Sequence, residues 1–311
     1  MSAQERDVRR IHVDTDPGLD DLLALALAAG SPELEVCGLT TVAGNAPIDA
    51  VTDNARRFIA LAGWNVPLGR GAAGPLALEP HDGTTIHGSD GRGGVALPEV
   101  GAAPLPTALE VLESSLIERG VEMVVALGPL TNIAALLRHR PDALERVELV
   151  WMGGSLGAGN VTPLAEFNAW CDPLAAHEVL RSGAPMRVIG LDVTGHTRLR
   201  PADLPSPPFG EGARGRFLRD VLHALMKAES TVYGEPVAVL HDPCAVLCAT
   251  DRTLFRYENR SLCCDATEGR SRGQLAASSD AGPAVRFAVE VNATEIERRF
   301  VDRLGAWSRS A

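Results

Sequence analysis

Apolar residues occur along the chain in two alternating patterns. Short, continuous apolar runs predict strands that are buried on both faces, whereas longer segments with apolar residues at helical spacing predict helices that cover them. The expected strands are residues 11–13, 34–41, 66–68, 121–127, 147–152 and 186–193. The expected helices are residues 22–29, 48–63, 107–119, 133–140 and 217–233.

This alternation predicts the fold class, which is α/β. Strands separated by helices are typical of an open, mostly parallel (Rossmann-like) sheet with helices on both faces. No internal repeat or long linker interrupts the pattern, and a further helix follows the Pro- and Gly-rich segment 201–212, so we expect a single domain over residues 1–311. In such sheets ligands bind at the carboxyl ends of the strands, and we expect the site there.

Four aspartates lie within eight residues directly after the first expected strand. The acidic segment reads Asp14-Thr15-Asp16-Pro17-Gly18-Leu19-Asp20-Asp21. Two like charges ~4 Å apart repel by roughly 4 kcal/mol at an effective dielectric of about 20, and a turn between two buried elements gives solvent little access. One aspartate that caps a helix is ordinary, but four indicate a hard cation with oxygen ligands, either Ca²⁺ or Mg²⁺.

Composition narrows the classes of partner. The chain is 45% hydrophobic and 22% charged, and its formal net charge of −11 argues against a nucleic-acid partner. No apolar run approaches the ~18 residues of a membrane span, and residues 1–10 lack the apolar core of a secretion signal. Six cysteines without zinc-type spacing are typical of free thiols in a reducing compartment. We therefore expect a cytoplasmic protein with no membrane or nucleic-acid partner.

Five short polar segments lie at the ends of expected strands. They are residues 14–21, 42–45, 126–132, 152–168 and 241–243. Because the carboxyl ends of parallel strands meet at one edge of a sheet, we expect all five segments to contribute to one site. A Gly-rich loop over residues 69–101 is long for a compact domain, and loops of this length are usually functional or disordered.

In these segments the chain resembles the inosine-uridine-preferring nucleoside hydrolases. The resemblance runs from Ile11 to about Glu290, and the acidic motif at residues 14–21 is its most specific part. It implies a single α/β domain that cleaves the N-ribosidic bond of a small-molecule ribonucleoside with tightly held Ca²⁺. It also implies a homodimer or homotetramer.

The same resemblance implies a role for each polar residue of the site. The Ca²⁺ ligands would be the side chains of Asp16, Asp21 and Asp242 and the backbone carbonyl of Leu127. The catalytic groups would be Asp20, as general base on a Ca²⁺-bound water, and His241, near the nucleobase. Asp14 would support the ligands from behind. The remaining substrate-binding residues would be Asn45, Asn160, Glu166 and Asn168 at the ribose hydroxyls, Met152 against the sugar, and His87 near the base.

Elementary chemistry agrees with these roles. Cleavage of an N-glycosidic bond builds positive charge on the ribose ring, which an anionic pocket stabilises. A hard dication lowers the pKa of bound water and orients two sugar hydroxyls. Asp20 begins a helix, where the dipole favours a carboxylate, and His241 titrates in the range needed to protonate a leaving base.

Several of these residues also have a purely structural interpretation. Asp242, which precedes a proline, is typical of a helix N-cap. Glu166 and Asn168 would share one face of a strand, or lie in a solvated loop. Met152 would be a core residue at a strand end, and His87 an exposed loop histidine.

Two other functions are open at this point. A haloacid-dehalogenase-type Mg²⁺ phosphatase also begins with Asp-x-Asp after a strand, although the second acid pair fits that family poorly. A non-catalytic nucleoside- or ribose-binding protein on the same scaffold would need neither a general base nor an acid. Within the hydrolases, His241 favours pyrimidine or broad specificity, because the purine-restricted branch typically lacks this histidine. Specificity also depends on loop 69–101 and helix 217–233, where Leu225, Glu229 and Tyr233 could face the base, but the sequence does not assign their contacts.

Overall fold

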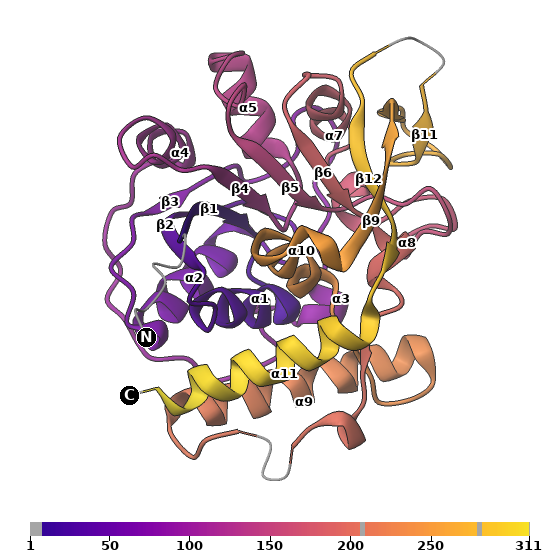
Figure 1. Ribbon diagram of the computed structural model, residues 1–311. Helices are drawn as coiled ribbons and strands as arrows, with labels where there is room; N and C mark the ends of the chain where they lie inside the picture. Colours follow the sequence, from indigo (N-terminus) through magenta and orange to yellow (C-terminus); the bar gives the residue numbers. More distant parts are fainter. Residues whose placement is uncertain (1–7, 206–208, 279–281, 311) are drawn as a thin grey trace, which may run out of the picture.

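An eight-stranded sheet runs through the computed structural model, which describes residues 8–205, 209–278 and 282–310 (Figure 1). Its strand order is β3-β2-β1-β4-β5-β6-β12-β9. The strands are β1 (Arg9–Thr15), β2 (Leu34–Thr41), β3 (Leu68–Arg70), β4 (Met123–Ala126), β5 (Glu148–Met152), β6 (Met186–Ile189), β9 (Phe255–Arg260) and β12 (Val285–Val291). Residues 1–7, part of the segment in which the sequence predicts no secretion signal, lie outside the described residues.

All neighbouring strands in this sheet are parallel except β9, which runs antiparallel to β12 at one edge. The central strands β1 and β4 are buried where they pair: Val13 pairs with Leu39 of β2 on one side and with Val125 of β4 on the other. Such strands need a helical cover on both faces to be buried. The predicted α/β fold with a mostly parallel sheet is confirmed.

Helices cover both faces of the sheet (Figure 1). The first face carries α1 (Leu19–Ala29), α2 (Ile48–Ala62), α9 (Ala213–Tyr233), α10 (His241–Thr250) and α11 (Ala293–Arg309). The opposite face carries α4 (Ala108–Ile117), α5 (Thr131–His139) and α7 (Pro173–Leu180). Each face has its own apolar core, because each layer of helices packs its apolar stripe against the sheet.

Short elements connect these layers. The helical ones are α3 (Thr84–His87), α6 (Phe167–Cys171), α8 (Leu191–Thr194), η1 (Pro201–Asp203) and η2 (Arg252–Leu254). Two small antiparallel pairs join β7 (Arg198–Leu199) to β8 (Ala238–Val239) and β10 (Leu262–Cys264) to β11 (Leu275–Ala277). The β7–β8 pair fixes the chain on both sides of α9, directly before α10. None of the described helices is both long and apolar enough to cross a membrane.

Three element bounds differ from the prediction by more than two residues. Helix α1 begins at Leu19 instead of residue 22, and α9 begins at Ala213 instead of residue 217. The first turn of α1 contains Asp20 and Asp21, and that of α9 contains Arg214 and Arg216, so neither shows the apolar spacing used for the prediction. The strand expected over residues 186–193 ends at Ile189, because Gly190 becomes the N-cap of α8.

Candidate active site

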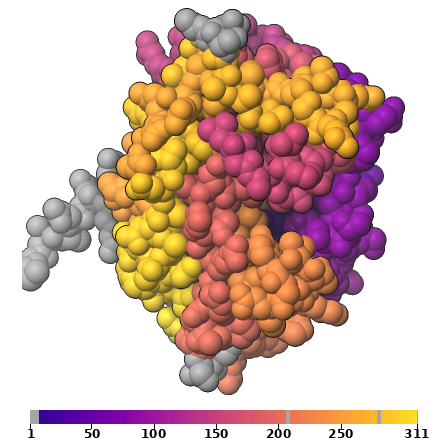
Figure 2. All heavy atoms as spheres, turned by 90° about the vertical axis from the view of Figure 1, so that its right-hand side faces the viewer, coloured from indigo at the N-terminus to yellow at the C-terminus, as the bar shows by residue number. Residues whose placement is uncertain are grey.

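The carboxyl ends of β1, β2, β4 and β5 and the start of α10 surround one cavity of about 450 Å³. Figure 2 shows the hollow on this side of the molecule, bordered by the orange end of α9 and the magenta loop after β5. The predicted site residues that line it are Asp20, Asn45, His87, Leu127, Met152, Asn160, Glu166, Asn168, His241 and Asp242. The other three predicted residues, Asp14, Asp16 and Asp21, are fully buried. The sheet thus brings together the segments that the sequence singled out.

Three carboxylates meet at this cavity. One oxygen each of Asp20, Asp21 and Asp242 lies within 4.8 Å of the other two. Asp20 and Asp21 lie in the first turn of α1, and Asp242 lies in the first turn of α10, so the positive ends of both helices favour negative charge here. The predicted ligand Asp16 is not one of these three, whereas the predicted base Asp20 is.

The Asp21 carboxylate is held by its own turn and by the loop after β2. Its Oδ2 accepts a hydrogen bond from the Gly18 N–H at 2.9 Å and from the Asn45 side chain at 2.8 Å. Its Oδ1 accepts from the Asp16 N–H at 3.2 Å and from the Thr15 hydroxyl. Asn45, which the sequence predicts at the ribose, therefore also positions a carboxylate.

The Asp16 carboxylate lies in a space that two glycines leave open. A Cβ atom at Gly44 would lie 2.1 Å from Asp16 Oδ2, and one at Gly128 would lie 2.4 Å from Asp16 Oδ1. Oδ2 accepts a hydrogen bond from the Asn45 N–H at 2.7 Å. Oδ1 is buried and has no hydrogen-bond partner among the described residues, which leaves it available to a cation.

Burial and mutual repulsion disfavour the ionised form of these acids. Burial, followed by the Asp21 carboxylate, raises the pKa of Asp16 and Asp242 well above the usual range and raises the pKa of Asp20 to about 7. Asp20 Oδ1, like Asp16 Oδ1, is buried without a hydrogen-bond partner in the described part of the chain. A divalent cation among the oxygens would reverse both effects, since it neutralises the charges and supplies the missing partner. The donor set contains only oxygen, so it fits Ca²⁺ or Mg²⁺.

Asp14 lies next to this turn and ties it to its neighbours. Its Oδ1 accepts hydrogen bonds from the Thr40 hydroxyl and, at 2.8 Å, from the Asn132 amide. Its backbone carbonyl accepts from the Leu127 N–H at 2.8 Å. Burial raises the pKa of Asp14 to about 7. These contacts agree with a supporting position.

Asn168 connects the carboxyl ends of β4 and β5. Its side-chain amide donates to the carbonyl of Leu127 at 2.7 Å and to the carbonyl of Met152 at 2.9 Å. The Leu127 carbonyl therefore faces the cavity with one lone pair engaged, and a second remains for a ligand. Met152 is buried, and it both belongs to the core and lines the cavity.

Glu166 is the N-cap of α6. Its Oε1 accepts from the Asn168 N–H at 2.9 Å, and its Oε2 accepts from the N–H groups of Gly154 at 2.6 Å and Ala169 at 3.1 Å. Burial raises the pKa of Glu166 in spite of these bonds. Asn160 fixes the same segment, since its Oδ1 accepts from the Phe167 N–H at 2.9 Å.

Two histidines line the cavity, His87, which is buried, and His241, which is partly exposed. The Leu19 N–H donates to His87 Nδ1 at 3.1 Å, so a neutral His87 carries its proton on Nε2. His241 Nδ1 is hydrogen-bonded to the Thr194 hydroxyl at 2.8 Å, which leaves Nε2 free to interact in the cavity. Burial lowers the pKa of both imidazoles to about 4, and His87 and Arg198 add to the effect on His241. The direction of this shift runs against the expectation that His241 titrates near neutral pH.

Three structural interpretations from the sequence are wrong. Asp242 is not an N-cap, because Leu240 occupies that position and Asp242 lies in the first turn. Glu166 and Asn168 do not share a strand face; a helix begins between them. His87 is not an exposed loop histidine, since only 9% of its surface is accessible.

Several residues of the cavity have no counterpart in the sequence prediction. Ile86 of α3 and the aromatic residues Phe167 and Trp170 of α6 line it, and the Trp170 ring lies 4.5 Å from that of His81. From α9 comes Val232, together with Leu225, Glu229 and Tyr233, which the sequence does name as residues that could face the base without assigning their contacts. Apolar and aromatic residues look the same in a sequence whether they face a core or a cavity. For Phe167 and Trp170, the only signal was that they are close to Asn168 in the sequence.

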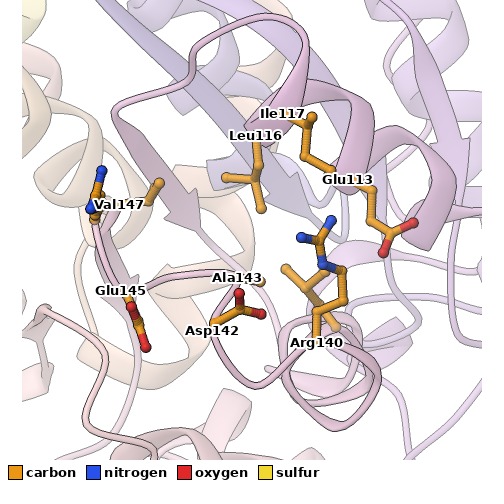
Figure 3. Close-up of a pocket in the computed structure, with 10 residues that line it drawn as sticks. Glu113, Leu116, Ile117, Arg140, Asp142, Ala143, Glu145 and Val147 are labelled. Atoms are coloured by element: carbon orange, nitrogen blue, oxygen red, sulfur yellow. The ribbon is translucent and has the colours of Figure 1, made fainter.

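A second hollow, of about 360 Å³, lies between α4 and the segment after α5 (Figure 3). Glu113, Ile117, Arg140 and Val147 are among its lining residues. It lies before the amino ends of β4 and β5, at the opposite edge of the sheet from the carboxylates. It contains none of the predicted site residues, so the chemistry of the molecule belongs to the first cavity.

Comparison with known proteins agrees with this geometry. A family model described as inosine-uridine preferring nucleoside hydrolase matches residues 11–298. The non-specific ribonucleoside hydrolase RihC of Escherichia coli (strain SE11) is 39% identical over 248 residues, which cover 79% of this chain and 80% of that protein. The protein of the same name from Shigella dysenteriae serotype 1 (strain Sd197) gives the same values.

Solved structures of similar proteins share the fold over nearly their whole length. The plant nucleoside hydrolase PpNRh1 has a TM-score of 0.88 and 29% identity, with 96% of this chain and 99% of that chain covered. The purine-preferring ribonucleoside hydrolase from Gardnerella vaginalis has a TM-score of 0.90 and 31% identity, with 97% and 100% covered. The family match includes the acidic turn after β1 and the start of α10. The chain therefore belongs to the inosine-uridine preferring nucleoside hydrolase family.

Proposed function

We propose that the chain is a Ca²⁺-dependent ribonucleoside hydrolase of broad or pyrimidine-favouring specificity. Hydrolysis of the N-glycosidic bond follows from its family; the ion, the base preference and the residue roles are the proposal. The observation that carries it is the group of three carboxylates at the cavity, Asp20, Asp21 and Asp242. Beside them, Asp16 Oδ1 and Asp20 Oδ1 are buried without a hydrogen-bond partner among the described residues. The names of two relatives, one non-specific and one purine-preferring, support a site that accepts more than one base.

The Ca²⁺ ligands in this proposal are Asp16, Asp21, Asp242 and the carbonyl of Leu127. When bound, the ion lowers the pKa of a water molecule and orients two ribose hydroxyls. The arrangement of the turn supports this assignment, since Asp21 is fixed by four hydrogen bonds and Asp14 braces the strand end behind it.

Asp20 is the proposed general base. It lines the cavity, whereas Asp16 and Asp21 do not, and its Oδ1 has no hydrogen-bond partner among the described residues. An ionised carboxylate at this place accepts a proton from the attacking water and also favours the positive charge that builds on the ribose ring.

The ribose hydroxyls would be held by side chains that the fold already positions: Asn45, Asn160, Glu166 and Asn168. Each makes at least one hydrogen bond that fixes its orientation, so little conformational entropy is lost on binding. Met152 would pack against the sugar. This preorganisation supports tight ribose recognition.

His241 and His87 are the proposed contacts of the nucleobase. Since burial holds the pKa of His241 at about 4, the neutral imidazole would donate a hydrogen bond from Nε2 to the leaving base. Full proton transfer from His241 would need the cationic form, which is scarce at neutral pH.

Location and assembly complete the proposal: a cytoplasmic protein that acts as a single domain and forms a homodimer or homotetramer. All six cysteines are free and five of them are buried, which supports a reducing compartment. Analytical ultracentrifugation would test the assembly, and a monomer at working concentration would contradict it.

The experiment that tests the function is release of reducing sugar from uridine, cytidine, inosine, adenosine and guanosine. We expect hydrolysis of several of them, and loss of activity after Ca²⁺ is removed by a chelator. Nucleosides that bind without turnover would favour the binding-protein alternative. Release of phosphate from aryl phosphates with Mg²⁺ would favour the phosphatase, an alternative that the family match does not support.

A further inference from the structure

Glu229 is a buried carboxyl group that the proposed reaction does not use. It lies on α9 and lines the same cavity as Asp20 and His241, with only 8% of its surface accessible. Its neighbours on the helix face, Leu225 and Tyr233, form a largely apolar wall on that side. A flat nucleobase suits such a wall better than a sugar does, because the polar side chains that suit hydroxyls come from the loops after β2 and β5.

Only one oxygen of Glu229 is engaged. Oε2 accepts a hydrogen bond from the Val239 N–H at 2.8 Å, in the β7–β8 pair. No described residue donates a hydrogen bond to Oε1. Because Val239 offers only an N–H, Oε2 must remain an acceptor, and the group that Glu229 can present to a ligand is Oε1.

We infer that Glu229 Oε1 accepts a hydrogen bond from the exocyclic amino group of a nucleobase, and that this contact admits cytosine and adenine. The inference rests on the proposed function. Cytosine N4 and adenine N6 are both donors, so one acceptor on this wall can serve a pyrimidine and a purine. Burial raises the pKa of Glu229 to about 8, and a protonated carboxyl would in addition donate to the carbonyl of uracil or hypoxanthine. When the group is protonated, its proton lies on Oε1, because Oε2 must accept from Val239; the acceptor for an amino group is therefore the ionised carboxylate, and the rates that test it are measured above pH 8.

In this structure, Glu229→Gln replaces the hydrogen-bond acceptor in the cavity with a donor. The amide oxygen must take the Val239 N–H, so the –NH2 group replaces Oε1 in the cavity and offers donors only. This –NH2 group cannot form a hydrogen bond with the amino group of cytosine or adenine, because both are donors. It can donate to the carbonyl of uracil or hypoxanthine. We expect the ratio of kcat/KM for cytidine to that for uridine, and for adenosine to inosine, to fall about tenfold or more.

Glu235→Gln is the matched control, because Glu235 is an exposed glutamate just beyond α9 that pairs with Arg200. It should leave both ratios unchanged. Thermal melting of each variant checks folding. A second test needs no variant: purine riboside, which is adenosine without its amino group, should have a KM for the unaltered enzyme about tenfold above that of adenosine.

Each outcome decides the inference. If Glu229→Gln lowers all four rates equally, or if neither ratio moves in a folded variant, Glu229 has only a structural role. Equal KM values for adenosine and purine riboside would overturn the inference even if the variant failed to fold. Hydrolysis of any nucleoside by the unaltered enzyme keeps the proposed function intact in these cases; no hydrolysis at all would remove both.

Discussion

At the scale of single residues, the acidic turn depends on where each oxygen points. Asp20 Oδ1 and Asp16 Oδ1 are both buried without a hydrogen-bond partner among the described residues, yet only Asp20 lines the cavity. A general base must reach the water that it activates, whereas a ligand must reach the ion. This difference separates the two proposed roles and makes them testable with nearly isosteric variants.

We predict that Asp20→Asn lowers kcat by about 10²–10⁴-fold, the range for loss of a general base, and leaves the bound Ca²⁺ and the melting temperature nearly unchanged. Asp16→Asn, in contrast, should lose the ion. Steady-state kinetics and elemental analysis of the same samples measure both effects. If Asp16→Asn kept its Ca²⁺ and lost more activity than Asp20→Asn, the base would be Asp16.

Gly44 matters because a larger residue would displace the Asp16 carboxylate. A Cβ atom there would lie 2.1 Å from Oδ2, and such overpacking costs roughly 1–3 kcal/mol. We predict that Gly44→Ala lowers the free energy of unfolding by that amount and weakens Ca²⁺ binding, as measured by denaturant titration and calorimetry. Gly101→Ala is the control, since nothing lies within 4 Å of its added Cβ. An equal effect of both variants would contradict the packing argument.

At the scale of elements, the sequence predicted the strands better than the starts of the helices. Strands buried on both faces stand out as apolar runs, and β1, β4 and β5 lie within two residues of their expected places. The first turn of a helix at an active site carries chemistry instead of packing, so α1 was predicted three residues late. The segment from Glu166 to Asn168 is a capped helix, because its polar residues bond to backbone instead of facing solvent.

A substitution at Asn168 tests whether its hydrogen bonds hold the ends of β4 and β5 together. Its amide donates to carbonyls at the ends of both β4 and β5, and an aspartate at this position would place an acceptor against two acceptors. We predict that Asn168→Asp lowers the free energy of unfolding by about 1–3 kcal/mol and raises KM for every nucleoside. Asn259→Asp, on the exposed side of edge strand β9, is the control. No change in stability or KM for Asn168→Asp would mean that these hydrogen bonds do not hold the site together.

At the scale of the whole molecule, the sheet explains how much of the site the sequence could reveal. Residues 16, 127 and 168 are distant in sequence, but each follows a strand of the parallel sheet or lies at the start of the helix after one, and that rule brings them together. Asp242 lies at the start of the helix after β8, which pairs antiparallel with β7 outside that sheet. The wall formed by α9 does not follow the rule. Its cavity-facing residues have the same spacing as those that face the core, so the sequence names Leu225, Glu229 and Tyr233 as candidates for the base but cannot assign their contacts.

The raised pKa values of the buried aspartates predict how pH affects the stability of the protein. Burial raises the folded-state pKa of Asp14 and Asp20 to about 7, and of Asp16 and Asp242 further. The folded chain without a metal therefore binds more protons than the unfolded chain, and its stability falls as pH rises, by up to about 1.4 kcal/mol per pH unit for each such acid.

The histidines change stability in the opposite direction, because burial lowers their folded-state pKa below the usual 6.5. This effect on stability is confined to pH values below about 6.5. Between pH 7 and pH 8.5 we predict that the chelated protein loses stability and that Ca²⁺ raises the melting temperature more at the higher pH. Differential scanning calorimetry with and without chelator measures this. A Ca²⁺ effect that shrinks with rising pH would contradict the assignment of the acids to the ion.

The central claim is that a divalent cation held by Asp16, Asp21 and Asp242 is required for nucleoside hydrolysis. The most direct test is elemental analysis of the unaltered protein and of Asp242→Asn, with uridine and cytidine hydrolysis measured on the same samples. We expect one Ca²⁺ per chain and turnover in the unaltered protein, and loss of both in the variant. Full turnover by protein that contains no divalent metal would contradict the account.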